Sequence, residues 1–271
     1  MTPLAKAGLR APLPTAAAPG TAEWTLQAAW AESEDDVRAA QALRYEVFVG
    51  ELGAHLPPEA TASGLDADRF DPVCDHLLVW AIDTGGRHER ELVGTYRVLA
   101  PDAARRMGGL YADQEFDLSP LAPLRERMIE LGRACVRANW RSGGVILTLW
   151  SALGRYMVRR KFDTMVGCAS VGLSDGGHYA SALWDTLRTS HLAAPEWQVR
   201  PRNALVLRPP SAVSAPLPLR AMPPLIKGYL RGGATVLGAP AYDAGFHTAD
   251  LPIMMRMQDL SPRYRTQFLL P

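Results

Sequence analysis

The stretch of sequence that most constrains the fold runs from residue 128 to 161 (MIELGRACVRANWRSGGVILTLWSALGRYMVRRK). Its first part is β-branched and apolar, as in an interior strand, yet it carries Glu130 and Arg133. The chain then turns through Gly143 and Gly144 and continues with apolar residues at helical spacing. A strand, a glycine turn and a helix in this order can present backbone N–H groups at the helix N-terminus, where a phosphate binds.

The remaining sequence predicts a mixed sheet flanked by helices, which is an α/β (α+β) fold class. Alternating or continuously apolar runs predict further strands at 23–30, 76–83, 91–99, 164–170 and 249–257, and a strand at 197–207 that Pro201 breaks. Helical spacing predicts a helix that begins at Ser33 and continues to Phe48, and helices at 178–190 and 225–237. The strands 76–83 and 91–99 flank a glycine turn and are expected to pair as a hairpin.

Three segments are expected along the chain. Residues 1–22 predict a flexible N-terminal tail, residues 23–208 the core domain, and residues 209–271 a proline-punctuated basic segment that packs on the core. The N-terminal segment lacks the continuous apolar run of a secretory signal. The uncharged stretch 142–154 is shorter than the roughly 20 residues that span a bilayer. We therefore expect a cytoplasmic protein, with peripheral contact at the inner membrane as an option.

Charge is unevenly distributed, although the net charge is only +1. From residue 200 onward there are nine Lys or Arg against three Asp or Glu, whereas the first 199 residues carry 20 against 25. A basic C-terminal part can face an acidic protein or an anionic membrane. A scattered, solvated set of charges explains the same counts. No nucleic-acid partner is expected.

The three cysteines, Cys74, Cys135 and Cys168, are widely spaced and form no CxxC pair. A sparse, odd set suits a reducing compartment and argues against a disulfide framework or a zinc site. Each is expected to be a small buried hydrophobic residue, and no metal site is predicted.

Charged side chains recur inside apolar segments, where arginine is rarely buried without a partner. They come from the first helix, from two strands and from the loop 55–72, and they are Arg44, Arg97, Glu130, Arg133, Asp66, Asp68 and Asp71. Taken singly, they are explained by a snorkelling stem or by turn chemistry. Taken together, they predict groups that pair with one another, in a core network or around a polar ligand.

Whether Glu130 and Arg133 can serve one site depends on the geometry of their strand. A spacing of three residues puts the two side chains on opposite faces of a regular strand. A β-bulge near Leu131 or Gly132 would bring both to the same site.

The turn after this strand is a candidate anion site. Its residues precede or begin the apolar helix, and they are Arg141, Gly143, Gly144 and Val145. A lone R-x-x-G pattern is weak evidence for phosphate binding, so the turn needs support from the residues around it.

Four short segments occur in the order and at the spacing of a known family: RYEVF (44–48), DADRFD (66–71), GTYR (94–97) and ELGR (130–133). In these segments the chain resembles the GCN5-related acyltransferases, and within them the branch shared by N-acyl-homoserine lactone synthases and bacterial N-acyl amino acid synthases. The longer segments RFDPVCDHLLV, ELGRACV and PPLIKGYLRGGA are similar to the ornithine N-alpha-acyltransferases of ornithine-lipid synthesis. The resemblance extends from Trp24 to Leu269.

The resemblance implies a mostly antiparallel central sheet and an enzyme that transfers an acyl group to an amine. The implied donor is an acyl carrier protein whose phosphopantetheine arm carries a 3-hydroxyacyl thioester. The implied acceptor is the α-amino group of L-ornithine, and the product is lyso-ornithine lipid. No permanently bound cofactor is expected.

The turn departs from the pattern of relatives that use acetyl-CoA. Those relatives have a small residue where this chain has Ile146. Branched bulk there narrows the backbone approach to a pyrophosphate, so a carrier-bound single phosphate fits the turn better than CoA.

The resemblance also assigns expected roles to the charged residues. Glu130 is the expected general base, with a pKa raised by partial burial, and Arg133 is expected beside it in the catalytic site. Candidates for the acceptor's carboxylate and ammonium groups are Arg44, Arg97, Asp66, Asp68 and Asp71. An equal alternative is that these residues form a salt-bridge scaffold that shapes the pocket.

Two alternative functions stay open from the sequence. One is a different acceptor, as in an acyl-homoserine lactone synthase or a synthase acting on another amino acid. The other is a carrier-protein-binding or membrane-binding module without catalysis. An acid on an interior strand argues against this second alternative, because a docking surface needs none.

Overall fold

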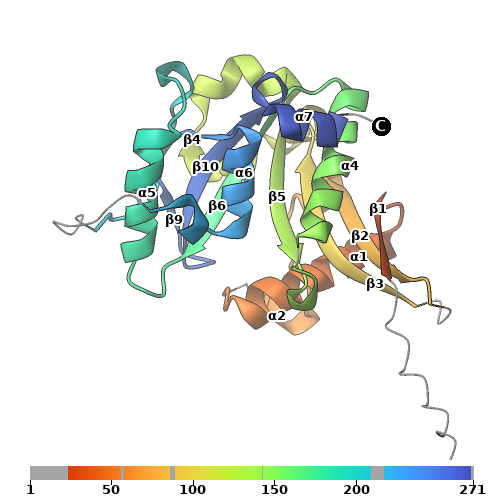
Figure 1. Ribbon diagram of the computed structural model, residues 1–271. Helices are drawn as coiled ribbons and strands as arrows, with labels where there is room; N and C mark the ends of the chain where they lie inside the picture. Colours follow the sequence, from red (N-terminus) through yellow and green to blue (C-terminus); the bar gives the residue numbers. More distant parts are fainter. Residues whose placement is uncertain (1–23, 56–57, 86–88, 142, 209–216, 270–271) are drawn as a thin grey trace, which may run out of the picture.

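The computed structural model describes residues 24–55, 58–85, 89–141, 143–208 and 217–269. Its eight-stranded central sheet consists of β1 (Trp24–Trp30), β2 (Asp75–Asp83), β3 (Arg90–Leu99), β5 (Met128–Val136), β6 (Thr164–Gly172), β8 (Thr235–Val236), β9 (Ala241–Asp243) and β10 (Thr248–Arg256). The strand order is β1-β2-β3-β5-β6-β10-β8, with β9 paired to β10 (Figure 1). Described strand pairs in this sheet are antiparallel except for β5 with β6. The expected α/β (α+β) class with a mixed, mostly antiparallel sheet is confirmed.

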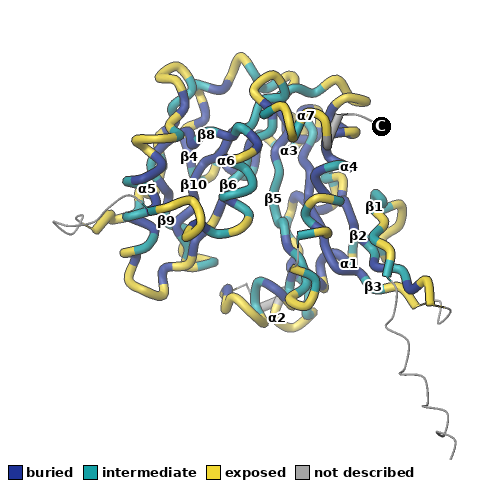
Figure 2. The backbone as a smooth tube through the Cα atoms, viewed as in Figure 1, coloured by how far each residue is buried: buried dark blue, intermediate teal, exposed yellow. Residues whose placement is uncertain are grey.

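Helices cover both faces of this sheet (Figure 1). The α-helices are α1 (Glu34–Tyr45), α2 (Pro58–Ser63), α3 (Pro101–Met107), α4 (Gly144–Arg160), α5 (His178–Ser190), α6 (Pro224–Gly232) and α7 (Pro262–Leu269). Helix α4 packs against β1, β2 and β3 on one face, and α1 packs against β2, β3 and β5 on the other. Helices α5 and α6 cover β6 and β10. The strands are largely buried and many of the connecting loops are exposed (Figure 2).

The first helix begins where its sequence predicts. The Ser33 hydroxyl accepts a hydrogen bond from the backbone N–H of Asp36, and the Asp36 carboxylate accepts one from the backbone N–H of Ser33. This reciprocal pair is a capping box. The helix then continues as a π-helical segment, Glu46–Glu51, which carries Phe48 to the wall of a central cavity.

Strands β5 and β6 are parallel neighbours that pair over a short distance. Residues 128–130 pair with residues 164–166, and the described parts of the two strands do not pair beyond them. The next residue of β6 is Gly167, where a Cβ atom would overlap the backbone oxygen of Leu131. The strands therefore approach closely at one end and diverge toward the other, which opens the centre of the sheet (Figure 1).

The segment 197–207, predicted as a strand broken by Pro201, forms only short extended pieces. Arg200–Pro201 (β7) pairs with β4 (Phe116–Asp117) outside the central sheet, and Ala204 forms an isolated bridge with Ala241 of β9. Proline has no N–H for a ladder and is confined to strand edges. The preceding Trp197 belongs to a 3-10 turn that begins with Pro195.

The helix predicted at 225–237 is too long. Helix α6 ends at Gly232, because Gly233 adopts the left-handed φ of 105° that closes a helix. The chain then enters the short strand β8. The other predicted strands and helices are present, with end points that differ by at most two residues except in the first helix, whose α-helical part ends at Tyr45 and not at Phe48.

The C-terminal segment 209–271 contributes to the sheet itself. Strand β10 pairs with β6 along its whole length, and α6, α7, β8 and β9 come from the same segment. The expected tail, residues 1–22, lies outside the described residues, as do residues 209–216 of the proline-rich connector. Among the described helices, none combines the length and the hydropathy that crossing a membrane requires.

Candidate active site

A cavity of about 630 Å³ lies where β5 and β6 diverge. Its walls come from β3, β5, β6, β10 and α6. The side chains of Tyr96 and Leu131 in these walls pack with the core on the α4 face of the sheet. Because successive side chains of a strand point to opposite faces, their neighbours Arg97 and Glu130 lie on the other face. The cavity therefore passes through the sheet and is reached by side chains from both faces.

Backbone N–H groups hold Glu130 at the cavity wall. The N–H of Tyr111 donates to one carboxylate oxygen at 2.6 Å and the N–H of Ala112 donates to the other at 2.7 Å. Glu130 is 5% exposed, and burial raises its pKa to about 7 against the opposing effect of these bonds and of Arg97. A carboxyl group with a pKa near 7 can take up a proton at neutral pH, as a general base must.

The strand that carries Glu130 has a bulge. Arg133 and Ala134 together lie opposite Tyr96, where a regular ladder would place one residue. Arg133 has a φ of 52°, a left-handed value that is uncommon outside glycine. The bulge lies one residue beyond the predicted position at 131–132, and it brings Arg133 to the cavity that Glu130 also lines.

Arg133 is held in a fixed direction. Its guanidinium lies 5.1 Å from the ring centroid of Tyr111 and 4.8 Å from that of Phe246. Its Nε is 3.2 Å from Asp66 Oδ2 and its Nη2 is 3.4 Å from Asp68 Oδ2. Two aromatic rings and two carboxylates thus keep a positive charge at the cavity wall.

The aspartates of the loop between α2 and β2 meet arginines. Arg44 is fully buried, with Nη1 2.8 Å and Nη2 2.9 Å from the carboxylate oxygens of Asp71 and Nε 3.3 Å from Asp66 Oδ2. Arg97 donates to Asp68 at 2.6 Å. With Arg133, three arginines face three aspartates in one network, as the sequence predicts for groups that must pair.

Among the described residues, two members of this network line the cavity, Arg97 and Arg133. The other four lie behind them, and they are Arg44, Asp66, Asp68 and Asp71. Their contacts are those of a salt-bridge scaffold, the alternative to direct substrate contact in the sequence analysis. Arg97 uses Nη1 for Asp68 and keeps other N–H donors of its fork for a ligand.

A cluster at the cavity wall, absent from the sequence predictions and here called the acidic wall, consists of Glu115, Cys168 and Asp250, of which Cys168 and Asp250 line the cavity. One ligand atom of each lies within 4.8 Å of the others, and the Cys168 thiol donates to Glu115 at 3.4 Å. Burial and the neighbouring Asp250 raise the pKa of Glu115 to about 8, and burial raises the pKa of Asp250. No described Lys or Arg forms an ion pair with these carboxyl groups, so a bound cation would stabilise their charged form.

The spacing of the acidic wall is also that of a metal site, but its thiol is poorly suited to one. Burial, with the charges of Glu115 and Asp250, raises the pKa of Cys168 well above its ordinary value. A thiol binds a metal as thiolate, so this environment weakens metal binding. The wall is better suited to an ammonium group, which needs only carboxylate acceptors.

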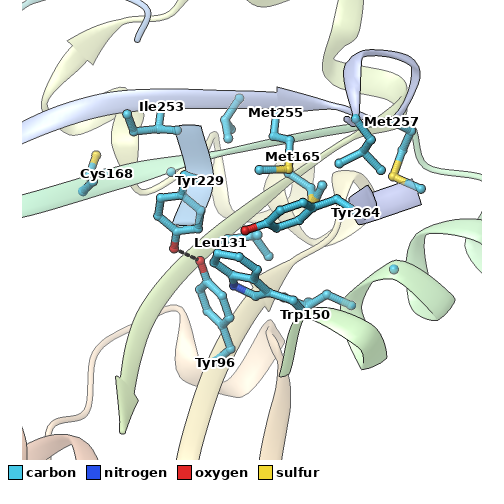
Figure 3. A pocket seen from close by; sticks show the side chains of 16 residues that line it. Tyr96, Leu131, Trp150, Met165, Cys168, Tyr229, Ile253, Met255, Met257 and Tyr264 are labelled. Carbon is cyan, nitrogen blue, oxygen red and sulfur yellow. Dashed lines mark hydrogen bonds between the residues drawn. The ribbon is translucent and has the colours of Figure 1, made fainter. Parts of the chain in front are cut away.

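A smaller apolar pocket of about 70 Å³ adjoins the cavity on the α4 side. Tyr229 stacks on Trp150 with ring centroids 5.4 Å apart, and the Tyr264 ring lies 5.9 Å from Trp150 (Figure 3). Flexible methionines complete the lining, namely Met165, Met255 and Met257. Such side chains adapt to ligands of different shape, so the pocket suits an alkyl chain.

The turn before α4 has the features of an anion site. Gly143 begins the helix with a φ of 101° and no side chain caps it, so the N–H groups of Gly144 and Val145 can face a phosphate. The Val145 side chain itself is buried in the core. Arg141 donates to Glu51 at 2.6 Å, which leaves phosphate binding to the backbone rather than to this side chain.

The signals for the missed residues were weak in the sequence. Glu115 follows a 3-10 turn, and Asp250 lies in a strand predicted only from its apolar pattern. Tyr96 belongs to a recognised segment, but its partner Tyr229 lies far along the chain. Asp250 is an acid inside the apolar run 248–256, and this position was the signal that could have marked it as a candidate site residue.

The central part of the chain is similar to acyltransferases of the GNAT type. A family profile described as the acetyltransferase (GNAT) domain matches residues 43–151, which include the scaffold, Glu130 and the turn of α4. Among solved structures, the chain is similar to FeeM, an N-acyl amino acid synthase from uncultured soil microbes. The identity is 14%, the TM-score is 0.48, and the match covers 92% of this chain and 97% of that chain.

Curated relatives define the family more narrowly. The chain is 38% identical over 245 residues to the L-ornithine N(alpha)-acyltransferase of Rhizobium meliloti (strain 1021), covering 88% of this chain and 82% of that protein. It is 38% identical over 247 residues to the enzyme of the same name from Agrobacterium fabrum (strain C58 / ATCC 33970), covering 89% and 84%. The chain belongs to the L-ornithine N(alpha)-acyltransferase family and is an acyltransferase.

Proposed function

We propose that this protein moves a 3-hydroxyacyl chain from acyl carrier protein to the α-amino group of L-ornithine, giving lyso-ornithine lipid. The observation that carries the proposal is the cavity through the sheet, which joins an apolar pocket on one face to a charged wall on the other. An alkyl donor and a doubly cationic acceptor need these two surfaces side by side. Relatives at 38% identity carry the name of an ornithine acyltransferase.

The charged wall fits an amino acid with a cationic side chain. Arg97 and Arg133 present guanidinium groups to which a carboxylate binds well. Asp243 and Asp250 line the same cavity without an ion-pair partner among the described residues, and they suit the side-chain ammonium. An acceptor held between these groups would direct its α-amino group toward Glu130.

The reaction forms a C–N bond and breaks a C–S bond. The neutral α-amino nitrogen attacks the thioester carbon, Glu130 accepts the proton that this nitrogen loses, and that proton passes to the thiolate as the C–S bond breaks. A pKa of about 7 keeps a substantial share of Glu130 ionised at neutral pH. Beyond residue 130, β5 does not pair with β6, and a backbone N–H freed there can hold the thioester oxygen as it gains charge.

The donor side fits a carrier-bound thioester. The N-terminus of α4 offers backbone N–H groups to a single phosphate. Helices α4, α6 and α7, here called the basic helices, carry no Asp or Glu and together contain Arg155, Arg159, Arg160, Lys227, Arg231, Arg263 and Arg265. This charge attracts an acidic carrier protein, and peripheral contact with an anionic membrane is the other use of it.

Reconstitution with purified components tests the proposal. The protein is mixed with 3-hydroxyacyl carrier protein and L-ornithine, and the products are identified by mass spectrometry. We expect the α-N-acylated amino acid, with lysine used less well and glutamine, which lacks the side-chain charge, used poorly. Faster acylation of an uncharged amino acid, or lactone formation from S-adenosylmethionine, would contradict the acceptor. No acyl transfer at all would favour a docking module.

A further inference from the structure

Two tyrosine hydroxyls, one from a buried residue and one from a partly buried residue, lie where the apolar pocket meets the cavity. Tyr96 from β3 and Tyr229 from α6 line both spaces. Their hydroxyl oxygens are hydrogen-bonded to each other (Figure 3). Most of the other residues that line the pocket are aliphatic, methionine or glycine. The pair therefore places polar atoms at the junction of an apolar space with a charged one.

The pair has one hydrogen-bond donor to spare. Each hydroxyl carries one O–H, and the bond between them uses one of the two. The second O–H has no acceptor among the described residues. Burial raises the pKa of Tyr96 to about 12, and burial with the neighbouring Tyr96 raises the pKa of Tyr229 well above its ordinary value, so both hydroxyls keep their protons at neutral pH. The spare donor therefore has no protein acceptor in this part of the chain and is available to the oxygen of a ligand that enters the cavity.

Packing fixes the direction of the Tyr229 ring. It stacks on Trp150 at an interplanar angle of 23°. Gly228, beside it on α6, lies so close to Trp150 that a Cβ atom would overlap the indole ring. The stacked ring and the close contact of α6 with Trp150 fix the position of the Tyr229 hydroxyl. Such a hydroxyl can discriminate between ligands, because it cannot turn away when a ligand offers it no acceptor.

We propose that the Tyr96–Tyr229 pair binds the hydroxyl of the 3-hydroxyacyl chain and so selects the donor. This inference rests on the proposed function and adds the residues that distinguish hydroxylated chains from plain ones. If the thioester carbon lies close to Glu130 and the end of the alkyl chain lies in the apolar pocket, then the first carbons of the chain lie at the junction between the two spaces. The oxygen on such a carbon meets the spare O–H, whereas an unsubstituted chain leaves it unsatisfied.

The test compares two carrier-bound donors of equal length, one with and one without the 3-hydroxyl group. Their kcat/KM ratio is measured for the wild type, for Tyr96→Phe, for Tyr229→Phe and for the double variant. Tyr156→Phe is the matched control. Its hydroxyl is also largely buried and donates to Asp75 at 2.7 Å, but it lines neither space.

We expect the wild type and Tyr156→Phe to prefer the hydroxylated donor. The double variant should lose about tenfold of this preference through a lower kcat/KM for the hydroxylated donor. The single variants should lose part of it, since the remaining hydroxyl can still donate. Removing both partners together leaves no orphaned polar atom, so the double variant should fold. If its thermal unfolding shows otherwise, the single variants decide, and at least one must lose preference.

Two results would overturn the inference. One is a folded double variant that keeps the wild-type preference. The other is an equal loss for both donors, which would place the pair at the thioester carbonyl or in the shape of the pocket. Wild-type protein that transfers neither chain to ornithine would instead contradict the proposed function, and the inference with it.

Discussion

Glu130 owes its two useful properties to different parts of the protein. The N–H groups of Tyr111 and Ala112 fix the direction of its carboxylate. Burial in the sheet raises its pKa toward neutrality. A carboxylate positioned by backbone groups needs no neighbouring side chain for orientation, so the N–H donors that Arg97 and Arg133 do not use for Asp66 and Asp68 are available for the proposed contact with the acceptor.

We expect Glu130→Gln to lower acyl transfer about 10²–10⁴-fold, because an amide cannot accept the proton. In the wild type, kcat/KM should fall as pH is lowered through about 7, since the protonated form of Glu130 is inactive. The check is the pH profile of both proteins with the carrier-bound donor. A Gln variant with the wild-type rate and the same profile would remove Glu130 from the mechanism.

Asp71→Asn should destabilise the protein, because it leaves Arg44 buried without its main partner. Breaking a buried ion pair lowers the free energy of unfolding by about 3–5 kcal/mol. Chemical unfolding of the variant and the wild type would measure this loss. Burial alone would raise the pKa of Asp71, but Arg44 and Arg97 lower it below its ordinary value of 3.8. Its stabilisation is therefore present above pH 3.8 and is lost as pH falls through the lowered pKa.

Asp250→Asn is the matched change on the cavity side. It removes one of two neighbouring buried acids, so the free energy of unfolding should stay level or rise, while the KM for ornithine rises. The two variants together distinguish a residue of the salt-bridge scaffold from a residue that binds the acceptor. If Asp71→Asn unfolds with the same free energy as the wild type, Asp71 is not part of a stabilising scaffold. If Asp250→Asn keeps the wild-type KM, Asp250 does not bind ornithine.

At the scale of elements, the site depends on how β5 and β6 part. The two strands pair over residues 128–130 and 164–166 and then diverge. Gly167 allows the close approach just before this divergence, and the bulge at Arg133 redirects β5 on the far side. Two local irregularities in adjacent strands thus shape one cavity.

Gly167→Ala tests this geometry. Its Cβ would overlap the backbone oxygen of Leu131, which cannot move without displacing β5, so we expect a loss of about 1–3 kcal/mol of stability. Gly172→Ala is the control in the same strand, because a Cβ there meets nothing within 4 Å. The measurement is thermal unfolding of both variants. Equal melting temperatures would show that β5 and β6 can move apart at Gly167 without loss of stability.

For the whole molecule, charge is separated although the net charge is +1. Among the described residues, acids outnumber arginines on the wall of the central cavity, and positive charge gathers on the basic helices. In the proposed function, the first arrangement would bind a small cationic acceptor and the second a large acidic carrier protein, at separate places on the molecule.

We expect acyl carrier protein to be a far better donor than the matching acyl-CoA. Its rate should fall steeply with added salt, because electrostatic steering is screened within about 10 Å at 0.1 M ionic strength. The measurement is the initial rate with each donor, carrying the same 3-hydroxyacyl chain, across a salt series. Equal kcat/KM values with equal salt dependence would remove the carrier protein and leave the basic helices to membrane contact.

The sequence by itself determined most of the local structure. Periodicity and turn residues predicted the sheet, the capped first helix and the strand, turn and helix at 128–161, because these depend on contacts between near neighbours. The same patterns failed at 197–207 and 225–237, where Pro201 and Gly233 end the regular structure. Charged residues inside apolar segments also predicted that Arg44, Arg97 and Arg133 would find partners.

Only the tertiary structure decided which of these groups line the cavity. Arg44 and Asp71 pair behind the cavity, whereas Arg97 lines it, and no pattern of spacing distinguishes the two situations. The acidic wall and the Tyr96–Tyr229 pair join residues far apart in the chain. Such contacts depend on how the strands and helices pack, so they arise only once β5, β6, β10 and α6 are assembled around one cavity.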